Sequence, residues 1–275
     1  IIVGPAGVGK TSLVHGLAHR LNNGNVPKLL KDKKIISINV ATLESNTKYR
    51  GEFEEKIIAI IKELKKNKDI ILFIDEIHMV MGAGATSGDP AGNLANILKP
   101  YISNDEIKLI GATTSEEYEK FVLSDQAFKR RFEKIIVNEP KYEMLLKILL
   151  GSIPKIEKVT QVNFDFDINI TKNILDLLIE VTDNKHQVYN DKLYNPDISL
   201  TILKKAFAYA SLENNNNVSI ANIAKSLKEC ERLNVTTRER SYNDMLMLAD
   251  DFDRQNERIE GKIISIKDLK KFEKK

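Results

Sequence analysis

The first eleven residues constrain the fold of this chain more than any other stretch. Ile1-Ile2-Val3 is a short apolar run, and a glycine-rich segment follows it at once. The residues from Ser12 to Ala18 then place apolar side chains at helical spacing. This order predicts a strand, a loop and a helix. The segment from Gly4 to Thr11 fits the P-loop (Walker A) pattern G-x-x-x-x-G-K-[ST] in the context that the pattern requires.

The chemistry of phosphate binding explains this spacing. Glycines let backbone N–H groups approach phosphate oxygens without an intervening Cβ, and a helix N-terminus presents unpaired donors with a partial positive charge. Lys10 would reach the β- and γ-phosphates, and the Thr11 hydroxyl would bind Mg²⁺. The alternative interpretation is a chance match in a glycine-rich turn. The sequence predicts binding of ATP and Mg²⁺ by Gly4, Pro5, Ala6, Gly7, Val8, Gly9, Lys10, Thr11 and Ser12.

Composition narrows the class of protein. The net charge of the 275 residues is 42 − 39 = +3, which is too small to indicate nucleic-acid binding by itself. The single cysteine, Cys230, excludes an internal disulfide framework and is typical of a reducing compartment. No apolar stretch is long enough for a membrane span. Because the chain starts inside a strand and without Met, we expect it to be a fragment of a longer protein.

A second candidate site follows an apolar run at residues 70–74. The run is apolar on both faces, as a central parallel strand is, and it ends in Asp75 and Glu76. An acidic pair at such a strand end, downstream of a P-loop, is the Walker B arrangement. Asp75 would hold Mg²⁺, and Glu76 would act as general base on the attacking water. The alternative is a strand end that meets solvent. His78 is interpreted as a packed or loop-facing residue.

The pattern of apolar runs predicts two domains. Five short apolar runs alternate with helical segments up to residue 140, which indicates a parallel α/β sheet in three layers; the runs are 1–3, 35–40, 70–74, 107–114 and 135–137. Ligands bind such sheets at the carboxyl ends of the strands. Beyond Pro140, apolar residues three and four apart predict helices at 141–153, 172–183, 197–213 and 219–233.

Five segments of the chain resemble, in order, the first ATPase domain of the Clp ATPases, the unfoldases and disaggregases of the AAA+ superfamily. They are Lys48–Glu55, Leu72–His78, Leu98–Pro100, Gly111–Tyr118 and Arg130–Phe132. The resemblance implies an AAA+ P-loop NTPase fold with a five-stranded parallel sheet in an αβα sandwich. It divides the chain into a large nucleotide-binding domain (1–140), a small all-helical lid (141–233) and a helical tail, which is a linker or a short middle-domain-like segment (234–275).

The resemblance also assigns roles to single residues. Thr114 would be the sensor-1 residue near the γ-phosphate; a position beside a helix N-cap is the alternative. Arg130 or Arg131 would be the arginine finger that completes the site of a neighbouring subunit, which implies a ring, and family members form hexamers. Without the family resemblance, these arginines would be interpreted as the solvated, basic end of a helix.

The resemblance further implies two loops that face a central pore. Tyr49, flanked by Lys48 and Arg50, would grip the polypeptide substrate; an ordinary turn tyrosine is the alternative. Residues 82–93 would form the second pore loop.

We therefore expect an ATP-hydrolysing AAA+ module that couples turnover to threading of unfolded or tagged proteins through a hexameric pore. A peptidase ring or a co-chaperone is a further expected partner of such a protein. The expected location is the cytoplasm, or the matrix of an organelle, with no membrane contact. The alternatives are a nucleic-acid-handling AAA+ ATPase of the loader or helicase type and a nucleotide-dependent scaffold. The small net charge and the aromatic pore residue argue against nucleic acid.

Overall fold

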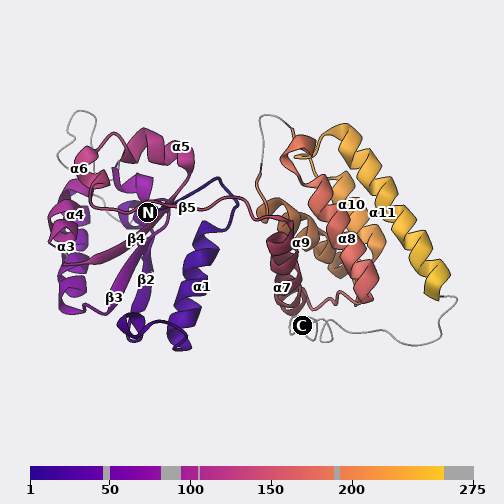
Figure 1. Cartoon of the computed structure of the whole chain (residues 1–275), viewed down its shortest axis with the longest axis horizontal. Coiled ribbons are helices and arrows are strands. Elements are labelled where there is room, and N and C mark those ends of the chain that lie inside the picture. The colour runs from indigo at the N-terminus through magenta and orange to yellow at the C-terminus, as the bar shows by residue number, and fades with distance from the viewer. Residues whose placement is uncertain (46–49, 82–93, 105, 189–192, 257–275) are drawn as a thin grey trace. The chain divides into compact units, whose positions relative to one another are not determined.

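The computed structural model describes residues 1–45, 50–81, 94–104, 106–188 and 193–256, without the side chains of residues 44, 50 and 250–256 (Figure 1). The chain divides into two compact units, Ile1–Asn138 and Glu139–Lys275. The first unit is α/β and the second is helical. None of the described helices is both long and apolar enough to cross a membrane.

A five-stranded sheet organises the first unit. Its order is β2-β3-β4-β1-β5, and every pair of neighbouring strands is parallel. The predicted parallel sheet is therefore confirmed. β4 lies between β1 and β3, so the segments that follow these two strands flank the carboxyl end of β4. The strands are β1 (Ile2–Val3), β2 (Lys34–Ile38), β3 (Ile70–Ile74), β4 (Lys108–Thr113) and β5 (Ile135–Ile136).

Helices cover both faces of this sheet (Figure 1). On one face, Val14 of α1 (Lys10–Asn22) belongs to the same buried cluster as Phe73 of β3. On the other face, Leu72 and Ile74 belong to a second cluster with α3 (Arg50–Lys66) and α4 (Leu94–Ser103). β3 is buried on both sides, as its unbroken apolar run predicts. The shorter elements are η1 (Lys28–Leu30), α2 (Val40–Ser45), η2 (Ile77–Met81), α5 (Ser115–Glu117), η4 (Tyr118–Val122) and α6 (Gln126–Lys129).

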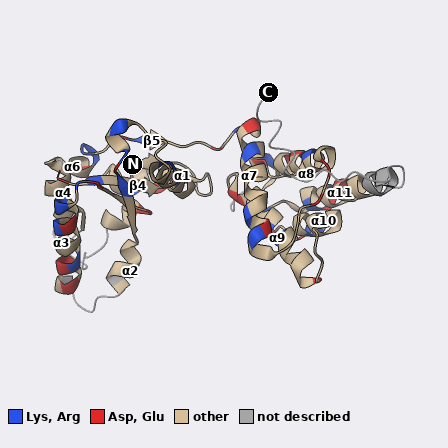
Figure 2. Ribbon diagram, turned by 90° about the horizontal axis from the view of Figure 1, so that it is seen from below, with Lys and Arg blue, Asp and Glu red and all other residues tan. Residues whose placement is uncertain are grey.

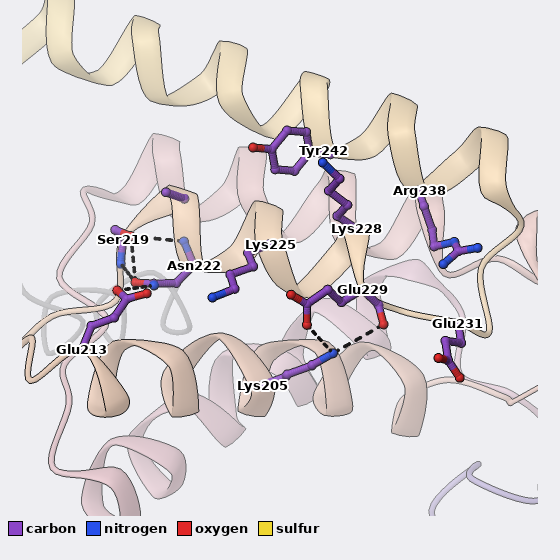
Figure 3. Close-up of a pocket in the computed structure, with 11 residues that line it drawn as sticks. Lys205, Glu213, Ser219, Asn222, Lys225, Lys228, Glu229, Glu231, Arg238 and Tyr242 are labelled. Carbon is purple, nitrogen blue, oxygen red and sulfur yellow. Dashed lines mark hydrogen bonds and ion pairs between the residues drawn. The ribbon is translucent and has the colours of Figure 1, made fainter.

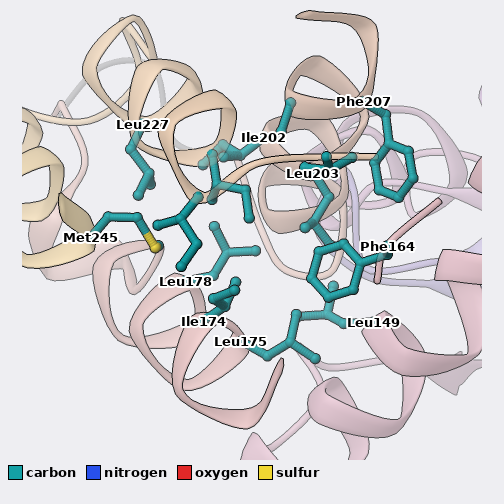
Figure 4. Close-up of a cluster of buried hydrophobic side chains, with 14 of the residues drawn as sticks. Leu149, Phe164, Ile174, Leu175, Leu178, Ile202, Leu203, Phe207, Leu227 and Met245 are labelled. Atoms are coloured by element: carbon teal, nitrogen blue, oxygen red, sulfur yellow. The ribbon is translucent and has the colours of Figure 1, made fainter. Parts of the chain in front are cut away.

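The second unit is a bundle of helices around one buried cluster, which Figure 4 shows. The predicted helices all occur, but the first of them continues past its predicted end at residue 153. Pro154 lies inside this helix, where it lacks the N–H of a helical hydrogen bond. Ile153 and Ile156 are both buried on either side of it, so packing outweighs that loss. The helices are α7 (Tyr142–Thr160), α8 (Ile168–Val181), α9 (Asp197–Leu212), α10 (Ile220–Lys228) and α11 (Val235–Asn256), with η5 (Asn184–His186) between α8 and α9.

The last helix differs from the separate tail expected over residues 234–275. α11 packs against α10 and α8, and Met245 is fully buried in the cluster of the helical unit (Figure 4). Tyr242, Leu246 and Ala249 are partly buried against the same cluster. The apolar face of this helix thus packs on the bundle, and the described part of the segment completes the helical unit.

Phe207 should make a large contribution to the stability of the helical unit. Its ring is fully buried and stacks on Phe164 with the ring centroids 6.0 Å apart. We expect Phe207→Ala to lower the free energy of unfolding of this unit by about 3–5 kcal/mol, because it leaves a cavity that the bundle cannot fill. Urea unfolding monitored by circular dichroism measures this loss. Leu212→Ala, at the exposed end of the same helix, is the matched control and should change stability by less than about 0.5 kcal/mol.

Candidate nucleotide-binding and hydrolysis site

The P-loop joins β1 to α1 and adopts a backbone conformation that its glycines allow. Gly7 and Gly9 have φ values of 83° and 96°, a region that residues with a Cβ rarely adopt. Gly9 is the N-cap of α1 and makes no side-chain hydrogen bond to the helix. The N–H groups of the first turn are therefore not taken up by a capping side chain, and they can bind a phosphate.

Gly4 approaches the chain beyond β5 too closely for any side chain. A Cβ on Gly4 would lie 2.1 Å from the carbonyl oxygen of Val137, a backbone atom. We expect Gly4→Ala to lower the free energy of unfolding of the α/β unit by about 1–3 kcal/mol, and to weaken ATP binding because the loop must shift. Denaturant unfolding and titration with a fluorescent nucleotide measure the two effects. Gly16→Ala, where a Cβ meets open space, is the control; equal losses in both variants would contradict this account.

Lys10 and Thr11 connect the P-loop to the end of β3. The Lys10 ammonium donates hydrogen bonds to the carbonyl oxygens of Gly4 and Pro5, at 2.9 and 2.8 Å. Burial lowers the pKa of Lys10, and the nearby carboxylates of Glu76, Asp75 and Glu117 oppose this effect. Thr11 Oγ1 donates to Asp75 Oδ2 at 2.7 Å. The structure thus brings together the two predicted halves of the site, although they are far apart in the sequence.

Asp75 and Glu76 have different surroundings at the end of β3. Asp75 is half-buried, and its Oδ1 accepts the backbone N–H of Glu76 at 3.1 Å. Glu76 has a φ of 54°, a left-handed conformation that costs a residue with a Cβ about 1–2 kcal/mol. Its side chain is 54% exposed. Such strain at a strand end is typical of functional sites, and here it accompanies a carboxylate open to solvent.

The end of β4 carries a polar cluster that the sequence did not predict. Thr113 is 1% exposed, and its hydroxyl donates to Glu117 Oε2 at 3.1 Å. His78 Nδ1 lies 3.1 Å from Thr113 Oγ1 and 3.1 Å from Glu117 Oε2. Burial raises the pKa of Glu117, but hydrogen bonds from Thr114 and Thr113 and the nearby His78 outweigh it, so the net shift is downward. The cluster lies between the P-loop strand and the Asp75–Glu76 strand end.

Thr114, the predicted sensor-1 residue, is the N-cap of α5. Its hydroxyl accepts the backbone N–H of Glu117 at 3.2 Å, and the Glu117 carboxylate accepts the Thr114 N–H at 3.1 Å. This reciprocal pair is a capping box, which the T-x-x-E spacing could have revealed. A sensor role for Thr114 stays a prediction.

The two candidate arginine fingers are held differently. The Arg131 guanidinium donates to the Lys99 carbonyl oxygen at 3.2 Å, and it also contacts Ser103 Oγ and the Ala127 carbonyl oxygen. Arg130 follows α6 directly, is exposed, and has no hydrogen bond or ion pair from its side chain within the described part of the chain. Of the two, Arg130 has the guanidinium that is available for another subunit.

The oxygen atoms at this strand end suit a magnesium ion. The Thr11 hydroxyl and the Asp75 carboxylate converge on one another, and hard oxygen ligands of this kind are those that Mg²⁺ takes beside phosphates. Thr11 and Asp75 are therefore the residues that could hold the metal, as the sequence predicts.

The predicted pore-loop residues Lys48 and Tyr49 lie outside the described residues. The side chain of Arg50, at the start of α3, is also not described, and neither is the predicted second pore loop, 82–93. Their roles stay predictions.

A separate hollow of about 850 Å³ lies in the helical unit, between α9, α10 and α11 (Figure 3). Its charged side chains are in part engaged with one another: Lys205 pairs with Glu229 at 3.1 Å, and Asn222 donates to Glu213 at 2.9 Å. The described residues of this unit form no strand of the sheet, and its sequence contains no P-loop pattern. The candidate catalytic groups are those at the strand ends of the α/β unit.

The strand order and the site together define a P-loop nucleoside triphosphatase: the P-loop follows β1, the acidic pair follows β3, and β4 separates the two strands. Comparisons with known proteins narrow this class. Residues 1–140 match the family model described as ATPase family associated with various cellular activities (AAA). Over 214 residues the chain is 42% identical to the ATP-dependent Clp protease ATP-binding subunit ClpL of Staphylococcus aureus strain USA300, covering 78% of this chain and 29% of ClpL.

Solved structures of Hsp104 are similar as well. A closed-state cryo-EM reconstruction of Hsp104 with ATPγS and FITC-casein is 35% identical with a TM-score of 0.68, and covers 82% of this chain and 37% of Hsp104. The S. cerevisiae Hsp104–ADP complex is 34% identical with the same TM-score and the same coverage. The chain thus belongs to the AAA family of nucleotide-binding ATPases and, within it, to the Clp ATPases. It spans well under half the length of these relatives.

Proposed function

We propose that this chain is the ATP-hydrolysing module of a Clp-type protein unfoldase. The observation that carries the proposal is the hydrogen bond from Thr11 to Asp75, next to Glu76. The Lys10 ammonium interacts electrostatically with the carboxylates of both acidic residues. Lys10 and the P-loop N–H groups would bind and orient the phosphates. Glu76 would accept the proton of the water that attacks the γ-phosphate. Mg²⁺, held by Thr11 and Asp75, would neutralise developing charge on the phosphates.

The site would be completed by a neighbouring subunit. A guanidinium fork suits the charge that develops on a transferring phosphoryl group. Arg130 is exposed and its side chain has no partner among the described residues, so it is the candidate that could reach outward. An arginine supplied in trans implies head-to-tail assembly, and a closed ring is the arrangement in which every subunit both gives and receives one. A homohexamer, as in the family, is the proposed assembly.

The substrate of the proposed machine is polypeptide. The Hsp104 relative has been solved with casein, and the sequence around Tyr49 resembles a substrate-gripping pore loop. Lys and Arg alternate with Glu along α3 (Figure 2), and the net charge of the chain is only +3, so charge gives no support to the nucleic-acid alternative. A DNA affinity that fell steeply with salt would favour that alternative. The same proposal includes specific partners, such as a peptidase ring or a co-chaperone. It also includes a location in the cytoplasm or in the matrix of an organelle.

The test is ATP-driven unfolding of a tagged fluorescent protein by the full-length protein. We expect Tyr49→Ala to lower the unfolding rate at least tenfold while ATP hydrolysis continues, because the aromatic grip is lost and the nucleotide site is unchanged. Tyr49→Phe keeps an aromatic ring and should retain most of the unfolding activity. Unfolding by Tyr49→Ala at the wild-type rate would contradict the assignment of this residue. Absence of ATP-dependent unfolding in the wild type would contradict the proposed function itself.

A further inference from the structure

His78 occupies a position between the proposed general base and the end of β4. Its Nδ1 lies 3.5 Å from Glu76 Oε2, and the same nitrogen lies 3.1 Å from Thr113 Oγ1 and 3.1 Å from Glu117 Oε2. The side chain is only 15% exposed, and its ring stacks on Phe121 with the centroids 5.7 Å apart. Within the described part of the chain, His78 is the side chain that pairs with the Glu76 carboxylate.

The hydrogen-bond network identifies which ring nitrogen carries a proton. Thr113 donates its hydroxyl proton to Glu117 Oε2, so the lone pairs of Thr113 Oγ1 remain free to accept. Every partner of His78 Nδ1 is then an oxygen acceptor, which requires Nδ1–H on the imidazole. Nδ1–H donates to the Thr113 hydroxyl at 3.1 Å, and the carboxylates of Glu117 and Glu76 lie 3.1 and 3.5 Å from the same nitrogen.

The partners of His78 on the β4 side are fixed in place. Thr113 is buried at the end of the strand, and Glu117 is held by the capping box with Thr114. Glu76, by contrast, is more than half exposed and leaves β3 in a left-handed backbone conformation. A general base must hold its carboxylate within hydrogen-bond reach of the proton that it takes, and an unrestrained side chain loses this geometry.

We propose that His78 is a positioning residue for Glu76, whose Nδ1–H, anchored by Thr113 and Glu117, holds the Glu76 carboxylate in the orientation needed for ATP hydrolysis. The inference rests on the proposed function of Glu76 as general base. His78 itself neither accepts the proton of the water nor touches the phosphates. Its contribution therefore falls on the catalytic step and leaves nucleotide binding by the P-loop unchanged.

Amide substitutions of His78 test this role in the full-length protein. The amide of asparagine reaches the position of Nδ1, whereas that of glutamine extends to the position of Nε2. We expect His78→Gln to lower kcat about tenfold with KM for ATP and affinity for ADP unchanged within about twofold. His78→Asn should return kcat to within about threefold of the wild type. His19→Gln, an exposed histidine on α1 that contacts only Asn23 among described side chains, is the matched control.

The outcomes distinguish a role of His78 in positioning Glu76 from a role in packing alone. They also distinguish failure of this inference from failure of the proposed ATP hydrolysis. Equal kcat losses in His78→Asn and His78→Gln, tracking a fall in Tm, would mean that the ring only packs on Phe121, and would overturn the inference. If His78→Gln kept the wild-type kcat and Glu76→Gln were inactive, the inference would also be overturned. The proposed function would still stand in that case. A wild-type protein that does not turn over ATP would remove the proposed function, and the inference with it.

Discussion

Replacing Arg130 by alanine is expected to lower kcat for ATP hydrolysis by about 10³-fold or more in the assembled protein. The guanidinium of Arg130 is exposed and has no partner within the described part of the subunit, so its removal costs little in folding. Its proposed role is to stabilise phosphoryl charge in the next subunit's site. A coupled-enzyme assay of phosphate release at saturating ATP measures the loss, and fluorescent-nucleotide binding should be retained.

Arg131→Ala serves as the matched comparison. Because Arg131 donates to the Lys99 carbonyl oxygen and contacts Ser103, its loss should lower the stability of the α/β unit more than that of Arg130 does and lower kcat less. Subunit mixing makes the test more specific. Rings mixed from Arg130→Ala and Glu76→Gln subunits should regain turnover, since each Glu76→Gln subunit supplies an intact arginine to a neighbour with an intact Glu76. Mixed rings that stay inactive would contradict an arginine acting in trans.

Glu76→Gln is expected to lower kcat by about 10²–10⁴-fold. Glutamine has nearly the same shape as glutamate but cannot take a proton from water, so the chemical step fails while the site keeps its form. ATP affinity should stay within a few-fold of the wild type, because Lys10 and Thr11 are untouched. Single-turnover hydrolysis and equilibrium binding of ATP separate the two effects.

The control for this variant is Glu116→Gln, an exposed glutamate in the first turn of α5. It removes the same charge close to the site without removing the proposed base. A similar loss of kcat in both variants would show that the general field of negative charge matters, and would argue against proton transfer to Glu76.

The sequence predicted those parts of the site that depend on strand order. A P-loop must follow a strand, and an unbroken apolar run that ends in Asp75 must be a central strand. Once parallel strands lie side by side, their carboxyl ends share one edge of the sheet. The meeting of Thr11 with Asp75 at 2.7 Å follows from these two facts.

Other features depend on packing that no local pattern encodes. Thr113 and Thr114 are adjacent and chemically identical, and only the register of β4 decides that Thr113 points into the His78 cluster while Thr114 caps α5. His78 becomes important only because η2 and η4 pack together and bring Glu117 beside it. The apolar side chains of α11 are likewise spaced as in a helix, but the sequence does not say which surface they cover.

The most direct test of the account is the ATPase rate per subunit, measured as a function of protein concentration in the full-length protein. An enzyme whose site is completed by a neighbour must show a rate per subunit that rises with concentration as rings form and then levels off, and Glu76→Gln must abolish it. A very low rate that stays constant over the same range, with nucleotide still bound, would contradict the central claim. The protein would then be a nucleotide-dependent switch or scaffold rather than a ring ATPase.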